Sequence, residues 1–284
     1  MGESVRSDPG PNEQAESATA RSADDQAQAA YLPTAEHWDA QADDWARWAR
    51  AEGHDSYWSF HGARFHSLVP PPNPGAIALD LACGEGRVSR RLQADGWVVA
   101  ASDYGRRLCG WTRSSGIDAT ACASAAAVPF RSSSIDLVTV FMGFHDFDDP
   151  VMDTAFDEVA RILKPGGSAV IGINHPVHSF LDAQRVGESG LHFSVKHSYF
   201  GPVAYENVVR REGLELRFRG VQRPLQAYLD GFMSAGLLLD RFEEVTVPAE
   251  PEPTGASAKP AKPKGSPDWA KIPMFVDLRF VKPY

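Results

Sequence analysis

The residues best suited to chemistry lie in a glycine-containing turn near the first long apolar run of the chain. Residues 78–89 read ALDLACGEGRVS, which predicts a buried β-strand, a tight turn and the start of a helix. Gly84 and Gly86 permit backbone conformations that a side chain forbids, and they let a ligand approach the main chain closely. A second carboxylate, Asp103, follows Gly84 by nineteen positions at the end of the next apolar run. This pattern predicts a nucleoside site in which the acid accepts hydrogen bonds from ribose hydroxyls.

Two kinds of nucleoside cofactor compete for this turn. A dinucleotide site has the pattern G-x-G-x-x-G, but Ser89 stands where the third glycine would be. S-adenosylmethionine is the alternative, and Asp80, just ahead of the turn, could face its ammonium and sulfonium groups. A pyrophosphate would be repelled by Asp80 and Glu85. The turn therefore favours the methyl donor.

Three further blocks follow in order along the chain. They are VPF at residues 128–130, IDLVTV at 135–140 and RILKPGG at 161–167. With these blocks the chain resembles the class I S-adenosylmethionine-dependent methyltransferases, in particular their small-molecule group. The resemblance covers residues 76–174 and continues more weakly through 223–229 and 275–283. It implies an α/β Rossmann-like sheet of seven strands, mostly parallel with an antiparallel last strand, and helices on both faces.

The resemblance also implies a set of cofactor-binding residues. Ala82 replaces the usual first glycine of the turn, and Ser124 stands where many relatives have an acid that accepts from the adenine amino group. The expected cofactor-binding residues are Asp80, Ala82, Cys83, Gly84, Gly86, Asp103, Tyr104, Ser124, Ala125, Ala126, Phe141 and Met142.

Two histidines are candidates for a general base, which methyl transfer needs only if the acceptor must lose a proton. His145 follows the fourth expected strand, where the family often has a histidine, and His175 follows the fifth. Each also fits a structural role with one hydrogen bond. Ligands of open α/β sheets bind at the carboxyl ends of the strands. The walls of the substrate pocket are assigned to Trp38, Tyr57, Trp58, Phe144 and Tyr199.

Some nearby side chains have competing interpretations. The aromatic rings assigned to the pocket also fit the core, since large rings more often pack than recognise a ligand. Arg64 could meet the carboxylate of the cofactor. Asp146, Asp148 and Asp149 are interpreted first as a cluster at a helix N-terminus, and only second as catalytic acids.

The elements that must position these residues follow from the apolar pattern. Helices at 34–51 and 56–67 form an N-terminal cap, and an insertion at 175–222, with β-like runs at 199–209 and 214–218, follows strand five. Strands are expected at 76–81, 98–102, 118–121, 135–140, 167–174, 241–247 and 275–281, with helices at 150–162 and 225–235.

Composition narrows the class of protein. The net charge of −9 argues against a nucleic-acid partner. No apolar run approaches the roughly 20 residues that span a bilayer. Cys83, Cys109 and Cys122 lack metal-ligand spacing, so we expect no metal and reduced thiols in a cytoplasm. Residues 1–30 are expected to be a disordered leader, 31–284 a single domain and 250–268 a flexible loop. A homodimer is left open.

The sequence therefore predicts transfer of a methyl group from S-adenosylmethionine to a small molecule. The expected acceptor is an aromatic or heteroaromatic, indole- or phenol-like metabolite of specialised metabolism, methylated on O, N or C. A nucleic-acid methyltransferase would have an Asn/Asp-Pro-Pro-aromatic tetrad after strand four, where residues 141–144 read FMGF. An NAD-dependent reductase would need the missing third glycine. A non-catalytic regulatory module that binds S-adenosylmethionine is the remaining alternative.

Overall fold

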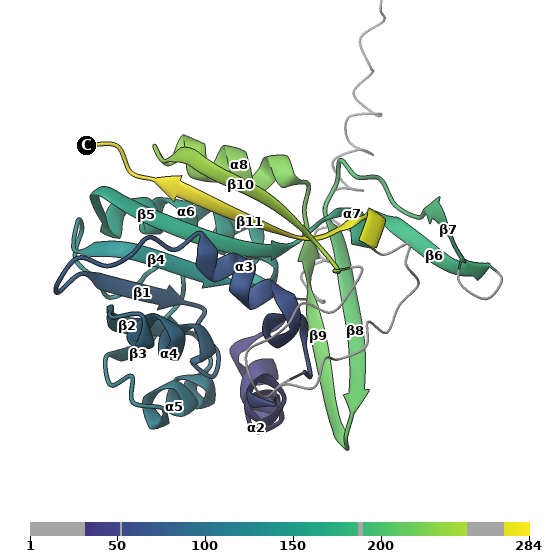
Figure 1. Cartoon of the computed structure of the whole chain (residues 1–284), viewed down its shortest axis with the longest axis horizontal. Helices are drawn as coiled ribbons and strands as arrows, with labels where there is room; N and C mark the ends of the chain where they lie inside the picture. Colours follow the sequence, from purple (N-terminus) through teal and green to yellow (C-terminus); the bar gives the residue numbers. More distant parts are fainter. Residues whose placement is uncertain (1–31, 52, 187–189, 249–269) are drawn as a thin grey trace, which may run out of the picture.

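The computed structural model describes residues 32–51, 53–186, 190–248 and 270–284, and its centre is a seven-stranded sheet (Figure 1). The strand order is β10–β11–β5–β4–β1–β2–β3. Strands β1 to β5 pair in parallel, and β11 runs antiparallel to both β5 and β10, which confirms the expected topology. The bounds are β1 Ile77–Leu81, β2 Val98–Asp103, β3 Thr120–Cys122, β4 Ile135–Phe141, β5 Leu163–Asn174, β10 Leu238–Thr246 and β11 Pro273–Val281.

Helices cover both faces of the sheet because its central strands are apolar on both sides. Leu79 and Leu81 pack in one core cluster with α6 (Asp149–Ile162) and α8 (Leu225–Ser234). Ala78 points to the opposite face, where it packs with α3 (Gly62–Ser67) and α4 (Arg87–Ala94). Helix α5 (Arg106–Ser114) lies against β2 and β3. Both faces of β1 are therefore buried, and only the strand ends are left to meet a ligand.

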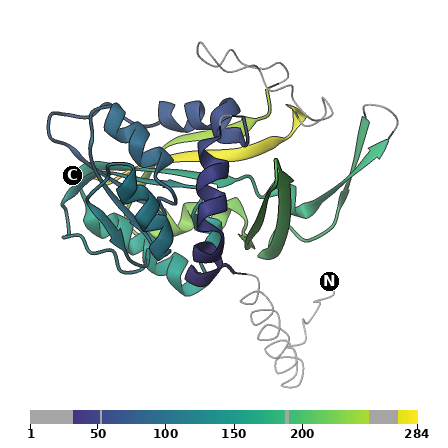
Figure 2. The same cartoon turned by 90° about the horizontal axis from the view of Figure 1, so that it is seen from below.

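The N-terminal cap is helical, as expected. It consists of α2 (Ala35–Arg50), a π-helix at Tyr57–His61, and α3. Thr34 caps α2 by accepting a hydrogen bond from the backbone N–H of His37 at 3.2 Å. Figure 2 shows α2 lying between the sheet and the hairpin of β8 (Val203–Arg211) and β9 (Leu214–Gln222).

The insertion after β5 contains two hairpins rather than the one that the sequence pattern predicted. The hairpin β8–β9 agrees with the two β-like runs. The additional hairpin is formed by β6 (Leu181–Val186) and β7 (Gly190–Val195), which follow the short helix α7 (Val177–Phe180) and project from the body of the molecule (Figure 1).

Helix α6 ends at Ile162, as expected, but the expected start of β5 is corrected. The sequence predicts that residues 164–167 end the helix and that the strand starts at 167. Instead β5 begins at Leu163, which pairs with Ile135 of β4 before a register shift. Lys164 holds this early segment in place because its Nζ donates to Asp136 Oδ2 at 2.7 Å.

Two expectations lie outside the described residues, namely the leader at 1–30 and the loop at 250–268. Within the described ranges, no helix has the length and apolar character needed to cross a bilayer.

Candidate functional site

The turn after β1 has the unusual backbone that its glycines suggested. Gly84 and Gly86 have φ values of 56° and 88°, in the left-handed region that glycine adopts without cost. Ala82 has a φ of 57° and Met142, in the loop after β4, a φ of 62°. Non-glycine residues in this region cost about 1–3 kcal/mol each. The turn therefore accommodates Ala82 in place of glycine, but with strain.

The loops after β1 and β4 approach each other closely at Gly143. A Cβ built on Gly143 would lie 2.7 Å from the Cβ of Ala82, a distance that real Cβ atoms essentially never show. The strained residues Ala82 and Met142 flank this contact. The carboxyl ends of two neighbouring strands are thus packed without intervening side chains, which brings main-chain atoms to the edge where a ligand would bind.

Asp103 is fixed by the backbone around it. Its Oδ2 accepts from the N–H of Gly84 at 2.9 Å, and its Oδ1 accepts from the N–H of Gly105 at 2.8 Å. The side chain is buried, and burial raises its pKa to about 6 although both amides oppose this effect. One carboxylate therefore joins the turn after β1 to the end of β2.

Asp80 lies below the turn and is also buried. Its Oδ2 accepts from the hydroxyl of Ser89 at 2.6 Å, and its Oδ1 accepts from the hydroxyl of Thr139 at 3.1 Å. Burial raises the pKa of Asp80 to about 6. Ser89, which breaks the dinucleotide pattern, therefore has a role of its own: it binds the carboxylate that precedes the turn.

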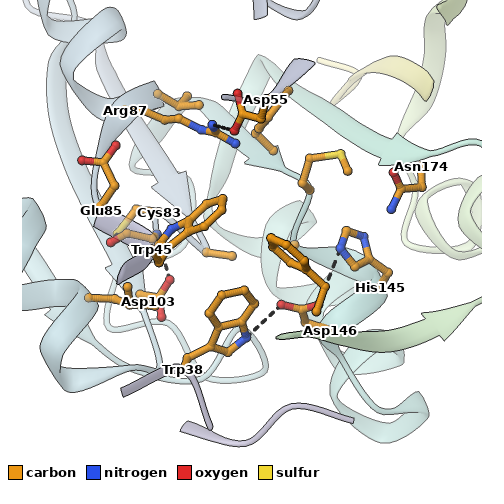
Figure 3. Close-up of a pocket in the computed structure, with 18 of the residues that line it drawn as sticks. Trp38, Trp45, Asp55, Cys83, Glu85, Arg87, Asp103, His145, Asp146 and Asn174 are labelled. Atoms are coloured by element: carbon orange, nitrogen blue, oxygen red, sulfur yellow. Dashed lines mark hydrogen bonds and ion pairs between the residues drawn. The ribbon is translucent and has the colours of Figure 1, made fainter. Parts of the chain in front are cut away.

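A cavity of about 380 Å³ opens over these strand ends (Figure 3). Its floor is formed by the turn and the ends of β1, β2 and β4, and its roof by α2 and the hairpin β8–β9. The expected site residues that line it are Trp38, Asp80, Ala82, Cys83, Gly84, Asp103, Tyr104, Phe141, Met142 and His145.

The roof is held together by hydrogen bonds between α2 and the main chain of β9. Gln41 Nε2 donates to the carbonyl oxygen of Arg217 at 3.1 Å, and the N–H of Arg217 donates to Gln41 Oε1 at 3.1 Å. His37 Nε2 also donates to the carbonyl oxygen of Arg217, at 2.9 Å. The helix and the hairpin are therefore joined directly over the cavity.

His145 and Asp146 lie side by side at the cavity, after β4 (Figure 3). His145 Nε2 is 3.5 Å from Asp146 Oδ1, and Trp38 Nε1 donates to Asp146 Oδ2 at 3.1 Å. Burial lowers the pKa of His145 to about 4 and raises the pKa of Asp146 well above its ordinary value. His145 is therefore neutral at pH 7 and able to accept a proton.

The preferred interpretation of the aspartates after β4, a cluster at a helix N-terminus, holds for Asp148 and Asp149, since Asp149 is the first residue of α6. Asp148 is the N-cap of α6, since its side chain accepts from the N–H of Val151 at 2.8 Å. Asp149 binds Arg223. Asp146 instead precedes the helix, in the short 3₁₀ turn Phe144–Asp146, and lines the cavity.

Several cavity residues were not assigned to the site from the sequence. Arg87 lies over the rings of Tyr57 and Phe141 and binds Asp55 of the cap at 2.5 Å. It takes the place at the cavity that was considered for Arg64, which lies exposed on α3. The only signal in the sequence was its position directly after Gly86. Trp48, Tyr205, Phe218 and Phe275 are further aromatic residues of the wall.

His175 does not line the cavity, so its expected catalytic role is corrected. Its Nε2 is 3.0 Å from Glu244 Oε1 on β10, and its Nδ1 accepts from the N–H of Val177 at 3.1 Å. Burial lowers the pKa of His175, and the neighbouring Glu244 opposes this shift. Both ring nitrogens are used in holding the start of the insertion.

Four of the five expected pocket residues also lie elsewhere, because their side chains complete the core or the cap. Phe144 is buried and stacks on Phe156 at 5.2 Å. Trp58 Nε1 donates to the carbonyl oxygen of Ala49 at 2.7 Å. The Tyr57 hydroxyl is 3.0 Å from His66 Nε2, and the Tyr199 hydroxyl accepts from the N–H of Leu225 at 3.2 Å. Of the predicted pocket residues, Trp38 lies at the cavity.

Four expected cofactor residues are not brought to the cavity wall. A Cβ on Gly86 would lie 3.0 Å from the Thr112 hydroxyl, so this glycine serves the packing of the turn on α5. Ser124 is exposed and accepts from the N–H of Ala126 at 3.2 Å, while Ala125 belongs to the core. The expected adenine contacts at 124–126 therefore lie beyond the cavity.

Known proteins that are similar to this chain include several methyltransferases. Residues 79–171 match a family model described as a methyltransferase domain. A demethylmenaquinone methyltransferase of Clavibacter sepedonicus is 35% identical over 127 residues, which are 42% of this chain and 48% of the relative. A ubiquinone/menaquinone biosynthesis C-methyltransferase of Stenotrophomonas maltophilia is 34% identical over 117 residues, 37% of this chain and 45% of the relative. The chain spans about half the length of the curated relatives that it matches.

Solved structures show the same fold at low sequence identity. A methyltransferase of Mesorhizobium loti, described as S-adenosylmethionine-dependent, superposes with a TM-score of 0.58 at 18% identity, covering 80% of this chain and 98% of its own. A putative methyltransferase of the same description from Listeria monocytogenes gives a TM-score of 0.58 at 17% identity, covering 78% and 97%. Residues 79–171 therefore match a methyltransferase domain, and the chain shares its fold with solved structures that are described as S-adenosylmethionine-dependent methyltransferases.

Proposed function

We propose that this protein transfers a methyl group from S-adenosylmethionine to a small-molecule acceptor. The observation that carries the proposal is the pair formed by Asp103 and the glycine turn, at the carboxyl edge of the sheet and under a cavity of about 380 Å³. The lining fits this cofactor and not a pyrophosphate, because the carboxylates of Asp80 and Asp103 face the same cavity. When bound, the cofactor supplies a methyl group on an electrophilic sulfonium.

The chain's own residues orient and hold the cofactor in this proposal. Asp103 accepts hydrogen bonds from the ribose, with its carboxylate already fixed by the amides of Gly84 and Gly105. Asp80 places negative charge below the turn, where the cationic amino-acid end of the cofactor would lie. Preorganised groups of this kind reduce the free energy spent on ordering when the ligand binds.

His145 is the proposed base. It lies at the cavity, its pKa of about 4 keeps it neutral at pH 7, and its Nδ1 has no partner among the described residues. The wall around it includes Trp38, Tyr205 and Phe218, which suits a flat, largely apolar acceptor. We therefore propose an aromatic or heteroaromatic metabolite, indole- or phenol-like and from specialised metabolism, as the acceptor.

The test is mass spectrometry of products formed from S-adenosylmethionine with an isotopically labelled methyl group. A panel of indoles, phenols, aromatic amines and quinols is incubated with the protein, and calorimetry measures binding of S-adenosylhomocysteine in parallel. A labelled product together with cofactor binding supports the proposal. Cofactor binding without any product would identify a regulatory module instead, and tight binding of a nicotinamide dinucleotide would overturn the cofactor assignment.

A further inference from the structure

Among the described carboxylates that line the cavity, Asp146 differs in having neither a cationic partner nor a second hydrogen-bond donor. Asp55 is paired with Arg87 at 2.5 Å, and Glu85 is paired with Arg90 at 2.8 Å. Each of these acids therefore has its charge compensated within the protein. Burying an uncompensated carboxylate is costly, so a charge that remains unpaired at a cavity needs an explanation.

The two carboxylates of the proposed cofactor site are also satisfied, although by neutral donors. Asp80 accepts from two hydroxyl groups and Asp103 from two backbone amides. In the described part of the chain, Asp146 has the indole N–H of Trp38 as its hydrogen-bond donor, at 3.1 Å. The ring of His145, 3.5 Å away, is neutral at pH 7 because burial lowers its pKa to about 4. Burial raises the pKa of Asp146 well above its ordinary value, and the described residues supply no positive charge that would favour its ionised form.

Aromatic rings surround the same carboxylate. The Trp38 ring donates to it, and the ring of Tyr205 lies 6.2 Å from the ring of His145. Tyr104 and Tyr205 line the same cavity as Asp146. The faces of aromatic rings attract cations, and a carboxylate among such rings is the combination that binds ammonium groups.

We propose that Asp146, with the rings of Trp38 and Tyr205, forms a subsite for an amine, so that the acceptor is an apolar or aromatic compound carrying an ammonium group. The ligand supplies the missing positive charge, and its scaffold lies against the aromatic wall. This inference rests on the proposed function in taking the cavity as the acceptor site. It goes beyond it by making a nitrogen substituent, rather than a ring alone, the feature that is recognised.

The experiment compares two probes of the same shape, phenethylamine and phenethyl alcohol, by isothermal titration calorimetry at neutral pH. Titrations use the full chain with saturating S-adenosylhomocysteine and are repeated without it. We expect the wild-type protein to bind the amine about tenfold or more tightly than the alcohol, the scale of one hydrogen bond to a charged group. In Asp146→Asn, which keeps an oxygen acceptor for Trp38, the preference should fall below about twofold.

Asp148→Asn is the matched control, because Asp148 is an exposed N-cap two residues away and asparagine also caps helices well. It should retain the wild-type preference. Equal binding of the two probes by the wild-type protein would overturn the inference, as would an unchanged preference in Asp146→Asn. Weaker S-adenosylhomocysteine binding in Asp146→Asn would also overturn it by placing Asp146 in the cofactor site. Failure of the wild-type protein to bind S-adenosylhomocysteine counts against the proposed function alone, since the titrations without it still measure the amine subsite.

Discussion

Replacing Gly220 with alanine tests whether the hairpin β8–β9 positions the acceptor wall. Gly220 pairs with Tyr205 across the hairpin. A Cβ built on it would lie 2.6 Å from the carbonyl oxygen of His145 and 2.9 Å from the Tyr205 hydroxyl. Ordinary van der Waals contact begins at 3.4 Å, so the hairpin or the His145 backbone must move by about 0.8 Å.

The size of the expected effect follows from this displacement. Overpacking a filled site costs about 1–3 kcal/mol, and a misplacement of about 1 Å near reacting groups can reduce the rate about a hundredfold. We expect kcat/KM for the acceptor identified by the panel to fall about ten- to hundredfold, with a Tm lower by several degrees. Affinity for S-adenosylhomocysteine, measured by calorimetry, should stay within about twofold because the floor of the cavity is not touched.

Gly201→Ala is the control in the same insertion, since a Cβ at Gly201 would meet no atom within 4 Å. It should match the wild-type protein in Tm, kcat/KM and cofactor affinity. A Gly220→Ala protein with unchanged Tm and kcat/KM would refute the reasoning, because it would show that the hairpin can move without consequence for the site.

Three other substitutions address the floor of the cavity and the proposed base. Asp103→Ala should weaken S-adenosylhomocysteine binding by about 1–3 kcal/mol, and unchanged affinity by calorimetry would contradict its ribose-binding role. Because the pKa of Asp103 is about 6, wild-type affinity should also fall as the pH is lowered from 7 through 6, where the protonated carboxyl no longer accepts from hydroxyls; a flat profile would speak against this carboxylate. His145→Ala should lower kcat while leaving cofactor affinity nearly unchanged, and wild-type turnover would exclude it as the base. Ala82→Gly should raise the free energy of unfolding by about 1 kcal/mol, because glycine adopts the φ of 57° at this position without strain. A lower Tm would show that the methyl group of Ala82 contributes packing that outweighs the strain.

The sheet and the floor of the site could be predicted from sequence because both depend on local patterns. Continuous apolar runs predict buried parallel strands, and carboxyl ends of parallel strands meet at one edge. Asp80, Gly84 and Asp103 could therefore be placed together from their positions relative to the runs. The positions of these three residues do not depend on the direction in which a loop side chain points.

The roof of the cavity and the surroundings of the proposed general base, His145, depend on long-range contacts that cannot be inferred from the sequence. The side chain of His175 contacts Glu244 on β10, which lies 69 residues later in the sequence. Because this contact is long-range, the sequence around His175 does not reveal that its side chain points away from the cavity. Phe144 and His145 are adjacent in a 3₁₀ turn, yet one packs on Phe156 and the other lines the cavity. In such a turn neighbouring side chains diverge, and no periodic pattern marks which of them faces inward.

The way in which α2 holds the hairpin has a practical consequence. Gln41 binds the N–H and the carbonyl oxygen of Arg217, atoms that every residue other than proline provides. The ends of the hairpin, Val203 and Gln222, are partners in the ladder and so lie next to each other. Residues 203–222 can therefore be exchanged as a unit for another antiparallel pair of equal length that keeps glycine at position 220, with the attachment to the helix preserved. Grafting such segments offers a direct way to change which acceptors the protein methylates while the residues proposed to bind the cofactor stay unchanged.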